Sequence, residues 1–414
     1  MKSSTNNRDA SKRLRILFVA MANSVHTARW LSQLRDTGWD IHVFDMLEAG
    51  LTPELKDVTA YTFYRPSEAS CNVREVHHQW LPETVAGFAR HRLPPLSRIL
   101  MRLVPSRVDT LTELIRKLKP DIVHSLEMQH ESYPLLEVRR RLGGEFSMPW
   151  IYSSWGSDLY LFGNQPQHQE LARGVLAACD YYVADCQRDV GLARKLGFRG
   201  EVLGVFPGAG GFDVSRMRRW MNPGSVSQRR VIALKGYTGW AGRALLALQA
   251  LHSCADLLHG YRVVVYLASA EVENVLHDVS HAMGIDFEIM PYSPNETIVK
   301  LMGRSRIAIG VSISDGTPNT MLEAMVMGAF PIQSDTVSTA EWINHGENGL
   351  LVPPEDPVAI AAAIRRALSD DALVDRAAEI NARITSERID RTVIQPQVIA
   401  MYEKVVARAG MTKK

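Results

Sequence analysis

The chain has 414 residues, of which 46% are hydrophobic and 22% are charged, and its formal net charge at pH 7 is +2. This length accommodates two domains of ordinary size, each with its own hydrophobic core. Because basic and acidic residues nearly balance, composition gives no electrostatic case for nucleic acid as a partner. The four cysteines lack metal-ligand spacing and are predicted to be buried free thiols in a reducing compartment: Cys71, Cys179, Cys186 and Cys254.

The first half of the chain alternates apolar runs with helical patterns. Residues 1–13 predict a disordered leader that is unlike a signal peptide, and the apolar run at 14–22 is too short to span a bilayer, so we expect a cytoplasmic protein. A helix capped by Asn23 or Ser24 is predicted up to Leu34. Strands are predicted at 16–20, 41–45, 121–124, 150–153, 181–184 and 202–206, with further helices at 111–118 and 189–196. This order predicts parallel pairing in a doubly wound sheet.

A second series of the same kind follows a stretch rich in turn formers. Strands are predicted at 231–234, 262–267, 287–290, 307–311 and 330–333, and helices at 357–368 and 393–407. The sequence therefore predicts four segments after the leader: a first domain at 14–222, a linker at 223–228, a second domain at 229–385 and a C-terminal helical segment at 386–414.

The turn after the strand at 307–311 is the most informative part of the sequence. It carries Asp315, and Pro318 then suits the first turn of a helix that Thr317 or Ser314 would cap and that carries Glu323 inward. A helix N-terminus presents backbone N–H groups and partial positive charge, which suit a pyrophosphate. Two acids at such a place would repel phosphate but suit sugar hydroxyls. The combination predicts a nucleotide-sugar site.

Asp315 and Glu323 lie in a segment that resembles the E-x7-E motif of retaining glycosyltransferases of family 4, with Asp in place of the usual first Glu. Residues 341–353 and Asp356 are similar to the closing pattern of that family. The resemblance extends from Arg15 onward and is strongest between 305 and 368. It implies an α/β fold of the GT-B type: two Rossmann-like, doubly wound domains that face each other across a cleft, with the helix in the segment 386–414 crossing back towards the first domain.

The resemblance also implies an activity. It is that of a retaining, metal-independent hexosyltransferase, which moves a sugar from a nucleotide-diphosphate sugar to an acceptor hydroxyl in polysaccharide, glycolipid or glycoconjugate biosynthesis, with no cofactor besides this donor. The sequence has no Asp-x-Asp in a metal-binding loop. Two alternatives stay open: a phosphorylase or epimerase that acts on a nucleotide sugar, and a catalytically silent partner in glycan assembly.

Residues of the second half would bind the donor. By resemblance, Asp315 contacts the donor sugar near the anomeric carbon as a catalytic residue, and Glu323 accepts hydrogen bonds from the ribose. The helix tip would stabilise the departing diphosphate through Thr317, Pro318, Asn319 and Thr320. After the first strand of this half, a glycine-rich segment offers positive charge and close backbone approach through Lys235, Gly236, Gly239, Gly242 and Arg243. The alternative for this segment is an ordinary turn with solvated charges.

Residues of the first half would bind the acceptor or assist catalysis. Asn23 and His26 follow the first strand, in a loop that relatives use for acceptor and donor sugar, although His26 could equally lie on a helix surface. His124 ends a segment that resembles the family's PDxxH pattern and is predicted to be catalytic, and its alternative is a buried, hydrogen-bonded histidine. Glu127 and His130 stay open as alternatives to His124.

Two further segments have two interpretations each. Asp158 ends a segment similar to the family's HGSD pattern, and it either accepts from an acceptor hydroxyl or caps the next helix. The basic and apolar segment 90–107 either rests on the inner face of an anionic membrane and reaches a lipid-linked acceptor, or packs as a helix with solvated arginines.

Overall fold

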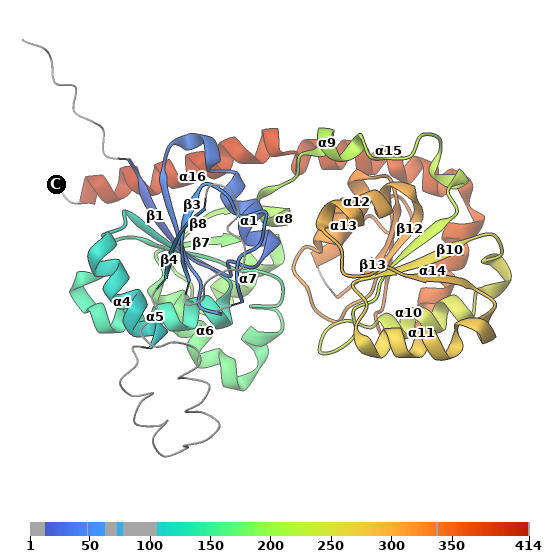
Figure 1. The fold of residues 1–414 in the computed structure, drawn as a ribbon, viewed down its shortest axis with the longest axis horizontal. Coiled ribbons are helices and arrows are strands. Elements are labelled where there is room, and N and C mark those ends of the chain that lie inside the picture. Colours follow the sequence, from blue (N-terminus) through green and yellow to red (C-terminus); the bar gives the residue numbers. More distant parts are fainter. Residues whose placement is uncertain (1–12, 48, 63–72, 78–105, 337, 413–414) are drawn as a thin grey trace, which may run out of the picture. The chain divides into compact units, whose positions relative to one another are not determined.

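The structure is a computed structural model that describes residues 13–47, 49–62, 73–77, 106–336 and 338–412 (Figure 1). The leader residues 1–12, Cys71 and residues 90–105 of the basic segment lie outside this range, so the predictions made for them are not addressed by the structure.

Strands and helices mostly alternate along the described chain, as the sequence predicts, with exceptions that include three successive strands at 40–77 and three successive helices at 357–412. In the first half they are β1 Arg15–Val19, α1 Val25–Ser32, β2 Asp40–Phe44, β3 Val58–Thr62, β4 Val73–His77, α4 Arg107–Leu118, β5 Ile122–Leu126, α5 Tyr133–Leu142, β6 Trp150–Ser153, α6 Pro166–Ala178, β7 Tyr181–Ala184, α7 Gln187–Lys195 and β8 Glu201–Val205. In the second half they are α8 Pro207–Gly210, α9 Val214–Arg218, β9 Val231–Lys235, α10 Ala244–His252, β10 Arg262–Tyr266, α11 Ala270–Met283, β11 Asp286–Ile289, α12 Asn295–Arg304, β12 Ser305–Gly310, α13 Asn319–Val326, β13 Phe330–Ser334, β14 Leu350–Val352, α14 Pro357–Ser369, α15 Asp371–Arg388 and α16 Arg391–Thr412.

The first sheet has eight strands in the order β4-β3-β2-β1-β5-β6-β7-β8. Its central strand β1 pairs in parallel with β2 and β5, with Ile16 opposite Ile41 on one side and Ile122 on the other. From Ile16 to Val19 every residue of β1 is fully buried, so both faces of the strand are covered. This explains the continuous apolar run that predicted the strand. Ser24 caps α1 through its hydroxyl, as predicted.

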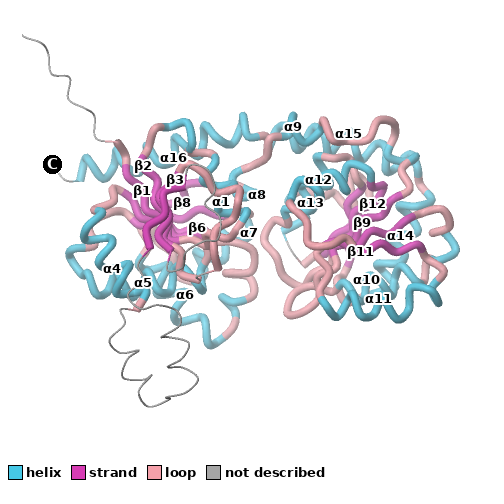
Figure 2. The backbone as a smooth tube through the Cα atoms, viewed as in Figure 1, coloured by secondary structure: helices cyan, strands magenta, loops and turns pink. Residues whose placement is uncertain are grey.

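The second sheet has six strands in the order β11-β10-β9-β12-β13-β14, and its strands pair in parallel. Alternate residues of each strand enter two cores. On one face, Ile232 and Leu234 pack with α10, α11 and α14, and on the other, Ala233 packs with α12 and α13 (Figures 1 and 2). Each half is therefore an α/β layered unit, and the predicted fold class is confirmed.

By contacts the chain divides into two compact units, one containing residues up to 153, 178–181 and 399 onward, and the other containing 154–177 and 182–398. In the first unit, Tyr402 of α16 is fully buried, and its hydroxyl accepts from Nε1 of Trp30 at 2.9 Å. The end of α16 is thus part of the core of that unit.

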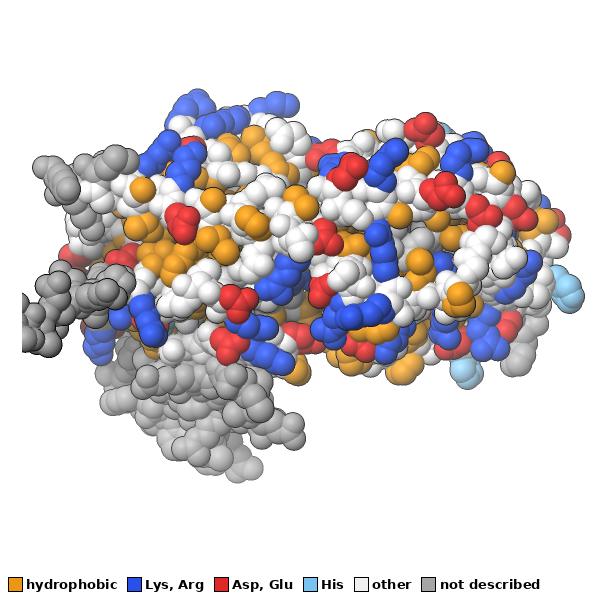
Figure 3. Space-filling view, turned by 90° about the horizontal axis from the view of Figure 1, so that it is seen from above, with side chains coloured by type: hydrophobic (Ala, Val, Ile, Leu, Met, Phe, Trp, Pro, Cys, Tyr) orange, Lys and Arg blue, Asp and Glu red, His pale blue; other side chains and the backbone are white. Residues whose placement is uncertain are grey.

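The distribution of surface charge and the state of the cysteines both match the expectations from composition. Basic and acidic side chains are interspersed over the face shown in Figure 3. Cys179, Cys186 and Cys254 are buried free thiols, as predicted. Across the described residues, every helix is too short or too polar to cross a bilayer.

Candidate active site

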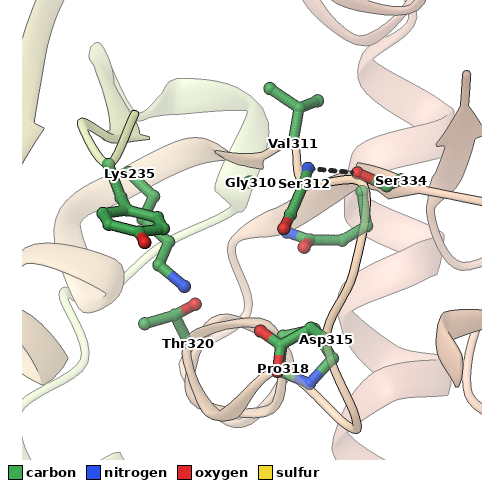
Figure 4. Close-up of a pocket in the computed structure, with 10 residues that line it drawn as sticks. Lys235, Gly310, Val311, Ser312, Asp315, Pro318, Thr320 and Ser334 are labelled. Carbon is green, nitrogen blue, oxygen red and sulfur yellow. Dashed lines mark hydrogen bonds between the residues drawn. The ribbon is translucent and has the colours of Figure 1, made fainter. Parts of the chain in front are cut away.

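A polar pocket lies at the carboxyl ends of three neighbouring strands of the second sheet, β9, β12 and β13. Its lining residues are Lys235, Tyr237, Gly310, Val311, Ser312, Asp315, Pro318, Thr320, Gln333 and Ser334 (Figure 4). Ligands of doubly wound sheets bind at this edge, where loops leave the strands. Of the residues predicted to form the site, the structure brings together Lys235, Asp315, Pro318 and Thr320.

Lys235 is the last residue of β9, and in Figure 4 its side chain extends towards Thr320 at the start of α13. Thr320 hydrogen-bonds the buried phenol of Tyr266, which fixes its position. An ammonium group beside a helix N-terminus is a favourable environment for an anion. This part of the pocket can therefore hold phosphate oxygens.

Asp315 is half-buried in the turn before α13 and lines the same pocket. Its Oδ1 accepts a hydrogen bond from the amide of Gly316 at 2.8 Å, so the carboxylate is fixed by its own turn. The hydroxyl of Ser334 accepts from the amide of Ser312 at 2.6 Å, which ties the turn to β13. The pocket thus combines a positive group with a fixed carboxylate that can accept from hydroxyls.

The helix α13 starts one residue later than expected. Pro318 occupies the N-cap position of α13, and no side chain of the described residues makes a capping hydrogen bond there. The prediction that Thr317 or Ser314 caps this helix is wrong. The Thr317 hydroxyl donates to the main-chain oxygen of Asp185, and the Ser314 hydroxyl donates to Ser157, so both are committed elsewhere. Asn319 is the first residue of the helix and is not among the lining residues.

Glu323 points inward, as predicted, and only 1% of it is exposed. Its Oε1 accepts from Nδ2 of Asn295 at 2.9 Å. It lies behind the helix tip rather than among the residues that line the pocket. The ribose contact predicted for Glu323 stays a prediction.

The glycine-rich segment after β9 folds tightly under the pocket. A Cβ atom at Gly236 would lie 2.6 Å from Val265 Cγ1, and one at Gly242 would collide with the carbonyl oxygen of Tyr237. Gly239 has φ +139, a conformation that favours glycine. These glycines shape the loop, and the segment is more than a solvated turn.

Arg243 does not reach the pocket. Its Nε donates to Glu355 at 3.0 Å, and its Nη1 donates to main-chain oxygens of the same loop, the shortest at 3.0 Å to Gly242. The diphosphate contact predicted for Arg243 is therefore not supported by its position, because the guanidinium braces the loop instead. The lysine predicted with it remains the cation of the pocket.

His124 is fully buried in the core of the first unit. One ring nitrogen lies 2.7 Å from the hydroxyl of Tyr402 and the other 2.7 Å from the hydroxyl of Ser153. Burial lowers the pKa of His124 to about 3, so the ring is neutral. A catalytic role in contact with substrate is contradicted by this position, and the alternative of a buried, hydrogen-bonded histidine describes it.

The remaining predicted residues have local roles. Asn23 is exposed in the loop after β1, and His26 is half-buried in the first turn of α1. Asp158 is buried and accepts from the amide of Trp155 at 2.9 Å, which closes a turn rather than capping a helix. Nδ1 of His130 lies 3.3 Å from the carboxylate of Glu127, whose hydrogen bond, and to a lesser extent its charge, raise the pKa of the histidine. The acceptor contacts predicted for Asn23, His26 and Asp158 stay predictions.

Sequence reasoning missed six lining residues, which are Tyr237, Gly310, Val311, Ser312, Gln333 and Ser334. A signal was available, because each of them lies at or just after the carboxyl end of a predicted strand, and these strands are neighbours in the sheet. It also missed Asp185, which follows β7 and contacts the turn of Asp315. That contact joins residues 132 positions apart, and no local pattern predicts it.

Comparison with known proteins places this geometry in context. Residues 243–370 match the family model described as glycosyl transferases group 1, and residues 15–77 and 84–185 match the model described as glycosyl transferase 4-like. Among solved structures, sucrose-phosphate synthase from Thermosynechococcus elongatus is similar at 15% identity, covering 96% of this chain and 100% of that one, with a TM-score of 0.69. HepE of Anabaena, solved in complex with UDP-glucose, is similar at 15% identity, 95% and 100% coverage and a TM-score of 0.66.

Two curated proteins are similar over shorter stretches. One is an exopolysaccharide phosphotransferase of Streptomyces coelicolor, 30% identical over 165 residues, which are 39% of this chain and 17% of that protein. The other is an uncharacterized glycosyltransferase of Methanocaldococcus jannaschii, 26% identical over 114 residues, which are 27% of this chain and 29% of that protein. The matched stretches thus span less than a third of the length of either relative.

The fold is that of the GT-B glycosyltransferases, with two parallel sheets covered by helices. The family models matched in both halves go further than the fold. The chain belongs to the glycosyltransferase family 4-like proteins.

Proposed function

We propose that the chain is a glycosyltransferase that moves a sugar from a nucleotide-diphosphate sugar to an acceptor hydroxyl with retention of the anomeric configuration. The observation that carries this proposal is the convergence of Lys235, Asp315 and Thr320 on one pocket at the carboxyl edge of the second sheet. Membership of the family supports the same reaction class.

Charge stabilisation and positioning are the proposed source of catalysis. Lys235 and the tip of α13 would stabilise the negative charge that develops on the departing diphosphate. Asp315, held by the amide of Gly316, would accept hydrogen bonds from hydroxyls of the donor sugar. In this scheme the leaving phosphate takes the acceptor proton on the same face of the sugar, which gives retention. The bond from the anomeric carbon to phosphate breaks as the bond to the acceptor oxygen forms.

We further propose that the reaction needs no metal. A lysine and a helix N-terminus can do the work that a divalent ion does at a diphosphate. The absence of an Asp-x-Asp sequence supports this part of the proposal. A glycan or lipid-linked acceptor in polysaccharide, glycolipid or glycoconjugate synthesis fits the same reaction.

The test begins with a thermal-shift panel of UDP, ADP, GDP and their sugar conjugates, because a bound ligand raises the melting temperature by mass action. The best donor is then incubated with sugar and lipid-linked acceptors, with and without EDTA, and the anomeric configuration of the product is read by NMR. Transfer with retention and undiminished by EDTA is expected. Release of free sugar phosphate or an epimer would favour the phosphorylase or epimerase instead, and binding without any turnover would favour a silent partner.

A further inference from the structure

The turn that carries Asp315 is held by residues that follow β7. The amide of Thr317 donates to Oδ2 of Asp185 at 3.2 Å, and the Thr317 hydroxyl donates to the main-chain oxygen of Asp185 at 3.0 Å. Gly316 lies so close that a Cβ atom there would collide with the Asp185 carboxylate. Asp185 therefore fixes the backbone of the residue that follows this glycine.

Arg188, the second residue of α7, holds the same turn from its other end. Its Nη2 donates to the main-chain oxygen of Asp315 at 2.9 Å. Its Nε donates at 2.8 Å to Asp189, which is fully buried, and its guanidinium lies over the ring of Tyr160 at 4.2 Å. Because a planar guanidinium with three such partners has one orientation, the direction of the bond to Asp315 is set by α7.

A third segment, residues 338–341, joins the two. The hydroxyl of Ser338 donates to the main-chain oxygen of Gly316 at 2.8 Å. The carboxylate of Glu341 accepts from the first two backbone amides of α7, each at 2.9 Å. An acid at a helix N-terminus is a favourable cap. The turn, the start of α7 and the segment 338–341 therefore form a closed set of hydrogen bonds.

The geometry points to Asp185 and Arg188 as positioning residues, which hold the turn 315–317 so that the Asp315 carboxylate and the start of α13 meet the donor in a reactive arrangement. This inference rests on the proposed function of the pocket. Neither residue lines the pocket, so each acts through the turn rather than on the substrate.

A metal site is the competing interpretation of the same residues. Ligand atoms of Asp185, Cys186 and Asp189 lie within 4.8 Å of one another, the one such grouping found in the described part of the chain. The guanidinium of Arg188 already sits 2.8 Å from Asp189 and supplies the positive charge that a cation would bring. The positioning role accounts for these contacts without a further ion.

The protonation of Asp185 gives the inference a distinctive signature. Its Oδ1 is buried and has no hydrogen-bond partner among the described residues. Burial, then the charge of Asp189 and to a lesser extent that of Asp315, raise the pKa of Asp185 to about 8. The hydrogen bond from the Thr317 amide lowers this pKa and only partly offsets the rise. The charged groups near the Asp185 carboxylate are Arg188, whose positive charge favours ionisation of Asp185, and Asp189 and Asp315, whose charges oppose it. A neutral Asp185 holds the turn without adding repulsion.

The experiment compares Asp185→Ala, Asp185→Asn, Arg188→Ala and Arg188→Lys with the wild type. Arg194→Gln is the matched control, because Arg194 lies on the same helix and its guanidinium bonds carbonyl oxygens of residues 198 and 200 instead. Hydrogen–deuterium exchange of the peptide covering 313–320 is measured without ligand. Steady-state kcat and KM for the best donor among UDP-, ADP- and GDP-sugars are then measured from pH 6 to 9.

The expected result is faster exchange of the Gly316 and Thr317 amides in both alanine variants and a loss of kcat on the order of 100-fold, the cost of misplacing reacting groups, with a smaller change in KM. In the wild type, kcat should decline as pH rises through about 8, because ionisation of Asp185 adds a charge beside Asp189 and Asp315. Asp185→Asn keeps an oxygen that accepts from Thr317 and cannot ionise, so its kcat should stay near that of the wild type at neutral pH and should not show this decline. Arg194→Gln behaves like the wild type.

Unchanged exchange, or unchanged kcat in both alanine variants, would overturn the inference. The inference would also be overturned if Asp185→Asn lost kcat completely at every pH and its melting temperature fell in parallel. A wild type that neither binds nor turns over any donor of the panel would count against the proposed function, whereas exchange of the peptide would still decide whether the two residues hold the turn.

Discussion

Replacement of Lys235 by methionine removes the ammonium group and keeps most of the aliphatic stem. Lys235 is half-buried at the end of β9 and its side chain extends towards the start of α13 (Figure 4). A hydrogen bond between charged groups contributes about 1.5–3 kcal/mol. Since about 1.4 kcal/mol is a factor of ten in affinity, Lys235→Met should weaken binding of a nucleoside diphosphate roughly 10- to 100-fold.

Calorimetry with the nucleoside diphosphate chosen by the thermal-shift panel, and with the matching nucleoside, measures this effect. The variant should lose affinity for the diphosphate and keep its weak affinity for the nucleoside, because only the phosphates meet the lysine. The loss should be smaller at high ionic strength, since salt screens the partly exposed charge.

Lys300→Met serves as the control for the lost charge. Lys300 is exposed on α12 and pairs with Glu296 at 2.7 Å, outside the pocket. Lys300→Met changes the net charge of the protein by the same amount as Lys235→Met, but it should leave the affinity for the nucleoside diphosphate unchanged. Equal affinity of Lys235→Met and wild type for the diphosphate, or an equal loss for the nucleoside, would refute the assignment of Lys235 to the phosphates.

Three further predictions concern buried groups and close packing. His124→Phe removes both hydrogen bonds of the ring and should lower the free energy of unfolding by about 1–3 kcal/mol, measured by urea denaturation. Its kcat should stay at the wild-type value. A loss of kcat at unchanged stability would contradict the structural role of His124. Because burial lowers the pKa of His124 to about 3 from 6.5, the unfolded chain binds the proton first, so the contribution of His124 to stability should fall as pH drops below 6.5. This contribution is measured as the pH dependence of the difference in free energy of unfolding between the wild type and His124→Phe. Gly316→Ala sets a methyl group against the Asp185 carboxylate and should lower both melting temperature and kcat, whereas Gly191→Ala, in open space on α7, should preserve both. Because the pKa of Asp185 is raised to about 8 from 3.8, the folded protein holds a proton that the unfolded chain releases, so the contribution of Asp185 to stability should decline between about pH 4 and pH 8. A chemical-denaturation series should show this decline as the difference in free energy of unfolding between the wild type and Asp185→Asn.

The strands were predictable because burial on both faces leaves a strong local signature. The runs at 16–20 and 307–311 predict β1 and β12 within two residues of their observed bounds, since most positions of a central parallel strand are buried on both faces and therefore apolar or small. The inward position of Glu323 was predictable for a related reason: its neighbours on α13 are apolar and buried. Where a local pattern decides the structure, the sequence is a sufficient guide.

Side-chain destinations were less predictable, because they depend on neighbours that are distant in the sequence. Arg243 has the right charge in the loop that follows β9, but Glu355 and the carbonyl oxygens of that loop hold its guanidinium away from the pocket. His124 has the expected motif, but Tyr402, contributed by the last helix, occupies one of its nitrogens. Thr317 has the residue type of a cap, but Asp185 takes its hydroxyl.

The position of Arg243 also explains why Lys235 is the one cation among the described residues that line the pocket. A loop with three glycines loses more conformational freedom on folding than a loop of ordinary residues, so it needs internal hydrogen bonds to hold one shape. Arg243 supplies several of them from one guanidinium, which a lysine could not do with its compact ammonium group. Lys235 needs no such fork, because β9 fixes its backbone and its flexible stem can follow a phosphate. Arg243, which holds the loop, and Lys235, which would meet the anion, therefore need different side chains. Exchanging the two would remove the hydrogen bonds that support the loop and replace the flexible ammonium group of the pocket.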